Sequence, residues 1–228
     1  MSEEKLNLKF DIPLEQLEEI VGVSINSDFN GYDRVISPRD LVAVKGITFF
    51  RKKVLDSLIR RIPLRSEGKD RIYLYERAQI RVFGREPKGT EVGQTFILER
   101  KVMSILEGLE RGIFGEFVVK GVSKMPPAQI YGSDSEGKKA IAFYIPPFVE
   151  VHGNNAVIVD GIHRSYICGG AETTINAVHI YGVEIPLPFD PLSWEETKVV
   201  KEKPPIEERY KNLKREFFRD LGAVGIDG

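Results

Sequence analysis

The sequence predicts an α+β protein with a mixed β-sheet core and flanking helices, and three observations support this prediction. Residues 156–159 are four apolar, mostly β-branched residues between polar and glycine residues, which is typical of a buried strand. Strand-like runs also lie at residues 78–82 and 174–180. Residues 205–221 repeat apolar side chains at intervals of three or four, as an amphipathic helix does.

The composition sets limits on the class of protein. With 228 residues, 42% of them hydrophobic, the chain is long enough for one large domain or for a core with a smaller appended piece. The net charge of −1 gives no overall attraction to a polyanion. The single cysteine, Cys168, excludes an internal disulfide and fits a buried core position. Because no signal sequence or membrane span is recognisable, we expect a cytoplasmic protein that does not enter the membrane.

We expect the chain to be organised in three parts. Residues 1–70 are predicted to form a mainly helical extension, with helices at residues 13–21 and 47–62. Residues 71–190 are predicted to hold the mixed-sheet core. Residues 191–228 are predicted to form a helical extension packed on that core, because the apolar stripe of the amphipathic helix must be buried.

The core elements are expected in a definite order. A strand or strand pair at residues 71–83 precedes a helix at residues 96–109. Strands follow at residues 117–119, 140–144, 148–152 and 156–159, then a short helix at residues 162–168 and the strand at residues 174–180. The polar segment at residues 132–139 is predicted to be a hairpin-type connection.

The motif Asp-Gly-Ile-His-Arg at residues 160–164 lies where a strand passes through a glycine into the start of a helix. A helix start leaves backbone N–H groups unpaired, and His163 and Arg164 beside them are both able to donate to an anion. The pattern therefore predicts a phosphate site. The alternative is an ordinary Asp-Gly turn in which Arg164 simply pairs with Asp160.

This motif, with the helix and strand after it, resembles the signature of the ParB/sulfiredoxin superfamily, whose members carry Asp-Gly-x-His-Arg or a close relative at this point. The similarity extends over about residues 76–185. The resemblance implies a ParB/sulfiredoxin-like core in which nucleotide phosphates are held by Gly161, Ile162, His163, Arg164 and Ser165. It also implies that the loop and helix start facing this motif supply a second wall, with Gln94, Thr95, Glu99 and Lys101 as candidates.

The activity implied by the resemblance is nucleotide-dependent phosphotransfer to a small hydroxyl substrate, as in the free amino-acid kinases of the superfamily. ATP or another nucleoside phosphate would be bound together with Mg²⁺. Asp160 and His163 would orient the phosphates as catalytic residues, and Asp160 would contact the metal ion. Glu99 is the candidate base for the substrate hydroxyl, although an exposed helix position is the favoured alternative for this residue.

The sequence departs from the superfamily pattern in two places. Sulfiredoxins carry a cysteine directly before the His-Arg pair, where this chain has Ile162, so reductase chemistry is not expected. The segment after the core is too short and too rich in proline for the helix-turn-helix of the chromosome-partitioning members.

Two other functions stay open from the sequence. The first is a DNA-associated protein, of the partition, nuclease or DNA-modification kind. It would be helped by a basic helix face with Arg51, Lys52, Lys53, Arg60 and Arg61, although such a face is more often only solvated. The second is a nucleotide sensor without catalysis. The three histidines show no metal-ligand spacing.

Overall fold

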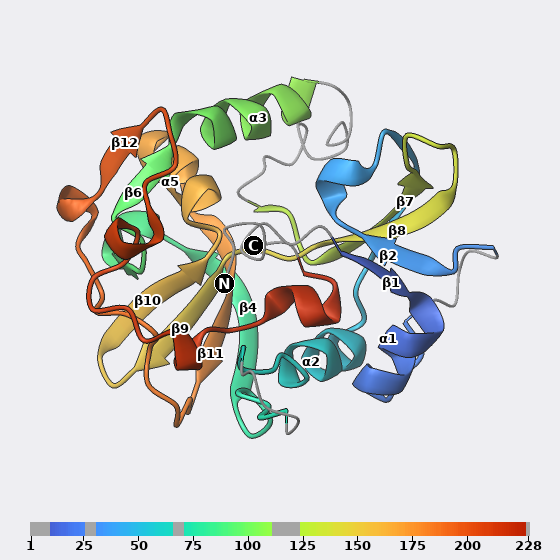
Figure 1. The fold of residues 1–228 in the computed structure, drawn as a ribbon, viewed down its shortest axis with the longest axis horizontal. Helices are drawn as coiled ribbons and strands as arrows, with labels where there is room; N and C mark the ends of the chain where they lie inside the picture. The colour runs from blue at the N-terminus through green and yellow to red at the C-terminus, as the bar shows by residue number, and fades with distance from the viewer. Residues whose placement is uncertain (1–9, 26–30, 66–70, 111–123, 227–228) are drawn as a thin grey trace.

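The computed structural model describes residues 10–25, 31–65, 71–110 and 124–226. In these ranges the chain forms two five-stranded mixed sheets with helices around them, so the predicted α+β class is confirmed (Figure 1). The first sheet has the order β1-β2-β8-β7-β3, and all its neighbours are antiparallel except β2 and β8. Its strands are β1 (Asp11–Pro13), β2 (Arg34–Ile36), β3 (Ala43–Phe49), β7 (Ala128–Ser133) and β8 (Lys139–Tyr144).

The second sheet has the order β4-β11-β9-β10-β5. β9 and β11 are parallel, as are β5 and β10, and the other neighbours are antiparallel. Its strands are β4 (Gln79–Arg85), β5 (Glu91–Val92), β9 (Phe148–His152), β10 (Asn155–Asp160) and β11 (Ile175–Tyr181). A small parallel pair is made by β6 (Phe96–Leu98) and β12 (Lys198–Val200).

The described residues contain four α-helices, and the other helical segments are short 3₁₀ turns. The α-helices are α1 (Leu14–Val21), α2 (Lys52–Arg60), α3 (Glu99–Glu110) and α5 (Ile162–Gly170). The 3₁₀ turns are η2 (Pro38–Asp40), η3 (Pro87–Gly89), η5 (Trp194–Glu196), η6 (Ile206–Glu208), η7 (Arg215–Phe217) and η8 (Leu221–Val224).

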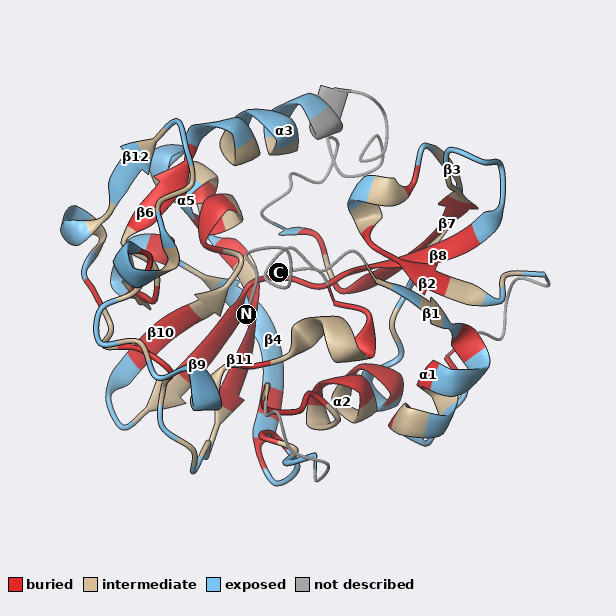
Figure 2. Cartoon of the chain, viewed as in Figure 1, coloured by how far each residue is buried: buried red, intermediate tan, exposed pale blue. Residues whose placement is uncertain are grey.

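A shared apolar cluster joins the two sheets. Leu17 of α1 and Leu58 of α2 belong to the same buried cluster as Ile141 of the first sheet and Val178 of the second. A separate cluster lies between α5 and the other face of the second sheet, where Ile162 meets strand residues. Figure 2 shows the same pattern, with buried residues concentrated in the strands and in the inward sides of α1, α2 and α5. Because burial is the main source of folding free energy, the two sheets stabilise each other.

The prediction that residues 1–70 are mainly helical was wrong. The helix at residues 13–21 is confirmed as α1, but the described part of this region also contains β1, β2 and β3, which pair with β7 and β8 (Figure 1). The helix expected from residue 47 begins only at Lys52. Residues 47–49 are instead paired with β7, because the β-branched side chains of Ile47 and Thr48 suit a pleated sheet and the pairing satisfies their backbone groups.

The helix predicted at residues 205–221 was also wrong. The segment contains the turns η6 and η7, joined by a bend and a turn at residues 209–212. Its backbone bonds run to distant residues: Asp190 N–H donates to Lys211 O at 2.9 Å, and Arg65 N–H donates to Phe218 O at 2.7 Å. The periodic apolar residues are partly buried, and they pack on other segments, as when Tyr210 stacks on Phe189.

Most other core predictions are confirmed. The expected strands and short helix correspond to β8, β9, β10, α5 and β11, and residues 132–139 connect the antiparallel strands β7 and β8. The strand expected at residues 71–83 is only partly confirmed, because β4 begins at Gln79 and residues 74–77 form a turn. The helix expected at residues 96–109 starts three residues later, because Phe96–Leu98 pairs with β12 as strand β6. The strand expected at residues 117–119 lies outside the described residues.

Candidate anion-binding site

The motif at residues 160–164 lies at the carboxyl end of β10. β5 runs parallel to β10 and ends at the same edge, where Gly93 N–H donates to Ile158 O at 3.2 Å. The loop after β5 and the start of α5 are therefore adjacent. Carboxyl ends of neighbouring parallel strands are a common location for ligand sites in open sheets.

His163 is buried, with 8% of its surface exposed. The backbone N–H of Leu98, at the junction of β6 and α3, donates to its Nε2 at 2.9 Å. Burial, and then the charges of Lys101, Arg164 and Arg39, lower its pKa from 6.5 to about 3. The ring is therefore neutral at pH 7, with Nε2 as acceptor and the proton on Nδ1. His163 links α5 to the start of α3.

Three cations from three separate elements help to lower the pKa of this imidazole. Lys101 belongs to the first turn of α3, Arg164 to the first turn of α5, and Arg39 to η2 beside the first sheet. All three depress the pKa of His163, which places their charges near the ring. The arrangement concentrates positive charge beside the Asp-Gly turn, and such a concentration favours a bound anion.

The side chain of Arg164 is partly committed to the protein. Its Nη1 donates to Ile145 O at 2.6 Å, its Nη2 lies 3.4 Å from Oδ2 of Asp160, and its guanidinium lies over the Tyr144 ring at 5.3 Å. The pairing with Asp160 is the alternative that the sequence left open. Arg164 is thus held in a fixed position, and its side chain is 17% exposed.

Gly161 has a left-handed backbone, with φ of 83°, directly before α5. A Cβ atom at this position would lie 2.8 Å from Cα, Cβ and Cγ of Pro147. The turn is therefore packed tightly against the connection between β8 and β9. Glycine is required here by the protein's own packing, whatever the turn binds.

We expect Gly161→Ala to lower the free energy of unfolding by about 2 kcal/mol, because both the positive φ and the contact with Pro147 oppose a side chain. Gly153→Ala is the matched control, since Gly153 has φ of 62° but no atom within 4 Å of its added Cβ. The control should cost only about 1 kcal/mol, from backbone strain alone. Urea unfolding of both variants checks the difference, and equal losses would contradict the packing argument.

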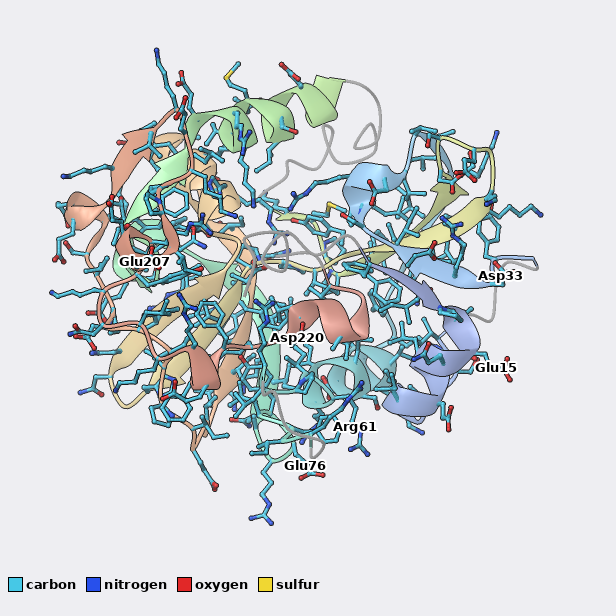
Figure 3. The ribbon with its side chains drawn as sticks, in the orientation of Figure 1. Glu15, Asp33, Arg61, Glu76, Glu207 and Asp220 are labelled. Carbon is cyan, nitrogen blue, oxygen red and sulfur yellow. The ribbon has the colours of Figure 1, made fainter. Side chains whose placement is uncertain are left out.

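Gln94 and Thr95 lie next to the motif but face the C-terminal segment. Nε2 of Gln94 donates to the Tyr210 hydroxyl at 3.4 Å. The Thr95 hydroxyl donates to Glu208 O, and its N–H donates to Arg209 O at 3.0 Å. Glu207 and Asp220, which are labelled in Figure 3, both belong to this segment. Thr95 is therefore used for docking this segment.

Glu99 is not brought to the site. It is exposed, and it lines a shallow depression together with Arg100, Met103, Ser104, Glu107 and Lys201. Lys101, two residues further along α3, lies about 200° away around the helix axis, since each residue turns an α-helix by about 100°. Glu99 therefore occupies an exposed helix position, which was the favoured alternative to a catalytic role.

Ile162, Ser165 and Cys168 have buried side chains. Ile162 packs in the apolar cluster under α5, and burial raises the pKa of the Cys168 thiol. Ser165 is fully buried, and its Oγ has no hydrogen-bond partner among the described residues. Of the predicted set, the backbone N–H groups at the start of α5 and the side chains of Lys101 and Arg164 are the candidate anion ligands.

Arg39 and Tyr144 were missed from the sequence. The capped turn at Ser37 is recognisable, and the Ser37 hydroxyl accepts from Arg39 N–H at 3.4 Å. Nothing local indicates that the charge of Arg39 acts on His163 of α5, which lies more than 100 residues later. The juxtaposition arises from the pairing of β2 with β8.

Comparison of the chain with models of protein families, with curated proteins and with solved structures found no match. The ParB/sulfiredoxin-like arrangement therefore stays a prediction. Of the helices in the described ranges, none has the length and apolar character needed to cross a bilayer. In the same ranges, no three His, Cys, Asp or Glu side chains form a group able to hold a metal ion.

Proposed function

We propose that the chain binds the phosphate groups of a nucleotide beside the Asp-Gly turn and transfers a phosphoryl group to a small hydroxyl substrate. The observation that carries the proposal is that the His163–Leu98 bond joins the start of α5, which holds Arg164, to the start of α3, which holds Lys101. The charges of Lys101, Arg164 and Arg39 all oppose protonation of this imidazole. Phosphoryl transfer depends mostly on positioning and on stabilising negative charge, which cations held by separate rigid elements supply.

The residues have distinct roles in this proposal. Lys101 and Arg39 neutralise phosphate oxygens, while the backbone N–H groups at the start of α5 donate to them. His163 is a positioning residue, because its bond to Leu98 N–H fixes the start of α3 and therefore Lys101. Asp160 is the carboxylate at the turn. It would hold Mg²⁺ together with phosphate oxygens, which is consistent with the preference of Mg²⁺ for one or two carboxylates plus substrate phosphates.

The basic helix considered for DNA binding gives less support to the second hypothesis. On α2, Lys52 pairs with Asp56, and Arg61 lies over the Tyr73 ring at 4.8 Å. Arg51 and Arg60 donate to the backbone carbonyls of Ser24 and Glu76, respectively. Most of these charges are thus engaged within the protein.

We expect Lys101→Gln to weaken nucleotide binding about tenfold or more, because it removes a charge-assisted hydrogen bond to phosphate. Arg100→Gln is the matched control, since Arg100 is the adjacent cation on the exposed side of α3 and lines the depression beside Glu99. The control should change affinity less than twofold, as expected for an exposed charge. Isothermal titration with ATP, ADP and CTP, with and without Mg²⁺, measures both effects.

A second measurement tests transfer itself. Phosphorus NMR of the nucleotide with a panel of small hydroxyl compounds, hydroxyl amino acids among them, should show a new phosphate ester. Nucleotide binding without any product would leave the sensor hypothesis in place of the transferase. If no nucleotide binds, or if Arg100→Gln is as harmful as Lys101→Gln, the proposal is wrong.

A further inference from the structure

The edge of the second sheet carries a basic and aromatic surface that the proposed function does not use. β4 is an edge strand, and it is largely exposed beside the buried strand β11 (Figure 2). Arg81, Phe83 and Arg85 alternate along β4, so they lie on one face of the sheet. They are paired in register with His179, Ala177 and Ile175 of β11, respectively.

Aromatic rings form a continuous layer on this face. Phe83 is 41% exposed and stacks on His179, with ring centroids 3.7 Å apart and planes 8° apart. Tyr181 follows at 6.4 Å from His179, and the Arg81 guanidinium lies 5.7 Å from the Tyr181 ring. The small Ala177 opposite Phe83 leaves room for the phenyl ring to lie over the imidazole. The outer surface of Phe83 therefore remains available for another planar group.

His179 contributes to this layer as an uncharged ring. Burial, and then the charge of Arg85, lower its pKa from 6.5 to about 4. Neither ring nitrogen has a hydrogen-bond partner among the described residues, so stacking holds the ring in place. At pH 7 it does not add a charge that would repel Arg81 or Arg85.

The two strands that form this surface carry charges of one sign. Neither β4 nor β11 contains an Asp or Glu, whereas β4 contributes Arg81 and Arg85. Consecutive side chains on one face of a strand are about 7 Å apart, so the exposed aromatic ring is flanked by a cation on each side. Exposed aromatic rings between cations are the elements with which proteins bind single-stranded nucleic acid without reading its sequence.

We propose that the face defined by Arg81, Phe83, Arg85, His179 and Tyr181 binds single-stranded nucleic acid. A base stacks on the outer side of Phe83, and Arg81 and Arg85 contact the phosphates on either side of it. A duplex cannot use this surface in the same way, because its bases are stacked on one another. The proposal is independent of the nucleotide site, since it uses none of the same residues.

The test is fluorescence anisotropy of the full-length protein with labelled twelve-nucleotide oligouridylate, oligothymidylate and a duplex of equal length, at low and moderate salt. We expect both single strands to bind more tightly than the duplex, with affinity falling as salt rises. Phe83→Ala should weaken binding roughly tenfold, within the range measured for loss of one stacked base. Arg81→Gln should weaken binding and reduce its salt dependence.

Val82→Ala is the matched control, because Val82 is 39% exposed on the same strand but points to the opposite face. It should leave affinity unchanged. Phe83→Trp keeps a stacking ring, and its fluorescence should be quenched by the oligonucleotide, which separates a lost contact from a misfolded variant.

Preference between the two single strands assigns RNA or DNA. Equal binding of the duplex, no binding of either single strand, or a Phe83→Ala protein that binds normally would overturn the proposal, whatever the outcome for mononucleotides.

Discussion

Arg219→Met is expected to lower the free energy of unfolding by about 3–5 kcal/mol, because it leaves a buried carboxylate without its partner. Nε and Nη2 of Arg219 each donate to one oxygen of Glu150 at 2.7 Å. Glu150 is fully buried in the middle of β9, and it also accepts from the Tyr75 hydroxyl and pairs with His152 at 2.8 Å. Burial alone would raise the pKa of Glu150, but the bonds from His152 and Arg219 lower it overall.

Chemical denaturation at pH 7 measures this loss, and Arg215→Met is the control. Arg215 pairs with Glu207 at 3.6 Å, and both side chains are more than half exposed. Removing a pair of this kind changes stability by less than about 1 kcal/mol. In a double variant, Glu150→Gln together with Arg219→Met should recover part of the loss, since the unpaired charge is gone. If Arg219→Met is no more harmful than Arg215→Met, the bidentate pair does not hold the C-terminal segment.

Acid should destabilise the protein through His163 well before most carboxylates titrate. The folded protein protonates His163 only near pH 3, whereas the unfolded chain does so near pH 6.5. Between these values the unfolded chain binds more protons. The contribution of His163 to stability is therefore fully present above pH 6.5 and falls as the pH is lowered. A shift of this size predicts that His163 alone removes about 2 kcal/mol by pH 5 and about 3 kcal/mol by pH 4.

His163→Gln tests this expectation, because the amide oxygen is able to accept the Leu98 N–H bond but does not titrate. Its stability should vary less between pH 7 and pH 5 than that of the wild-type protein, by about 2 kcal/mol. His179→Gln is a parallel variant, since His179 titrates near pH 4 in the folded protein and should show a similar flattening. If the unfolding free energy of His163→Gln depends on pH in the same way as that of the wild-type protein, the pKa of His163 is not lowered in the folded state.

Elements whose local pattern agrees with their tertiary environment were predictable. The apolar, β-branched run before Asp160 became β10, and the glycine after it adopts the left-handed conformation that only glycine reaches without strain. The helix α1 follows Pro13 and ends at Gly22, which has φ of 72°. In each case the boundary residues have a conformational preference of their own, so no distant contact is needed to place them.

Elements decided by distant partners were not predictable. Residues 205–221 have the apolar period of a helix, yet their backbone groups bond to residues at positions 63–65 and 188–190. Phe96–Leu98 has helix-compatible neighbours but pairs with a strand 100 residues away. Periodicity reports which side chains are buried, and it does not report which backbone groups bond to one another.

In the candidate site, too, residues in a local motif were predictable and residues placed by distant contacts were not. Asp160, Gly161 and Arg164 could be proposed because the motif is contiguous, and Lys101 because the resemblance places its helix opposite the motif. The sequence did not predict that the buried His163 ring accepts a hydrogen bond within the protein, because this bond depends on the position of the Leu98 N–H group. Arg39 was missed because only the first sheet brings it near the motif.

The path of the chain between the two sheets has a consequence for how the protein folds. Residues 11–49 build part of the first sheet, residues 79–92 part of the second, residues 128–144 complete the first, and residues 148–181 complete the second. Each sheet is thus assembled from two stretches separated by a piece of the other. No single cut divides the chain into halves that fold alone, and the long loops that must close before strands meet favour slow, cooperative folding.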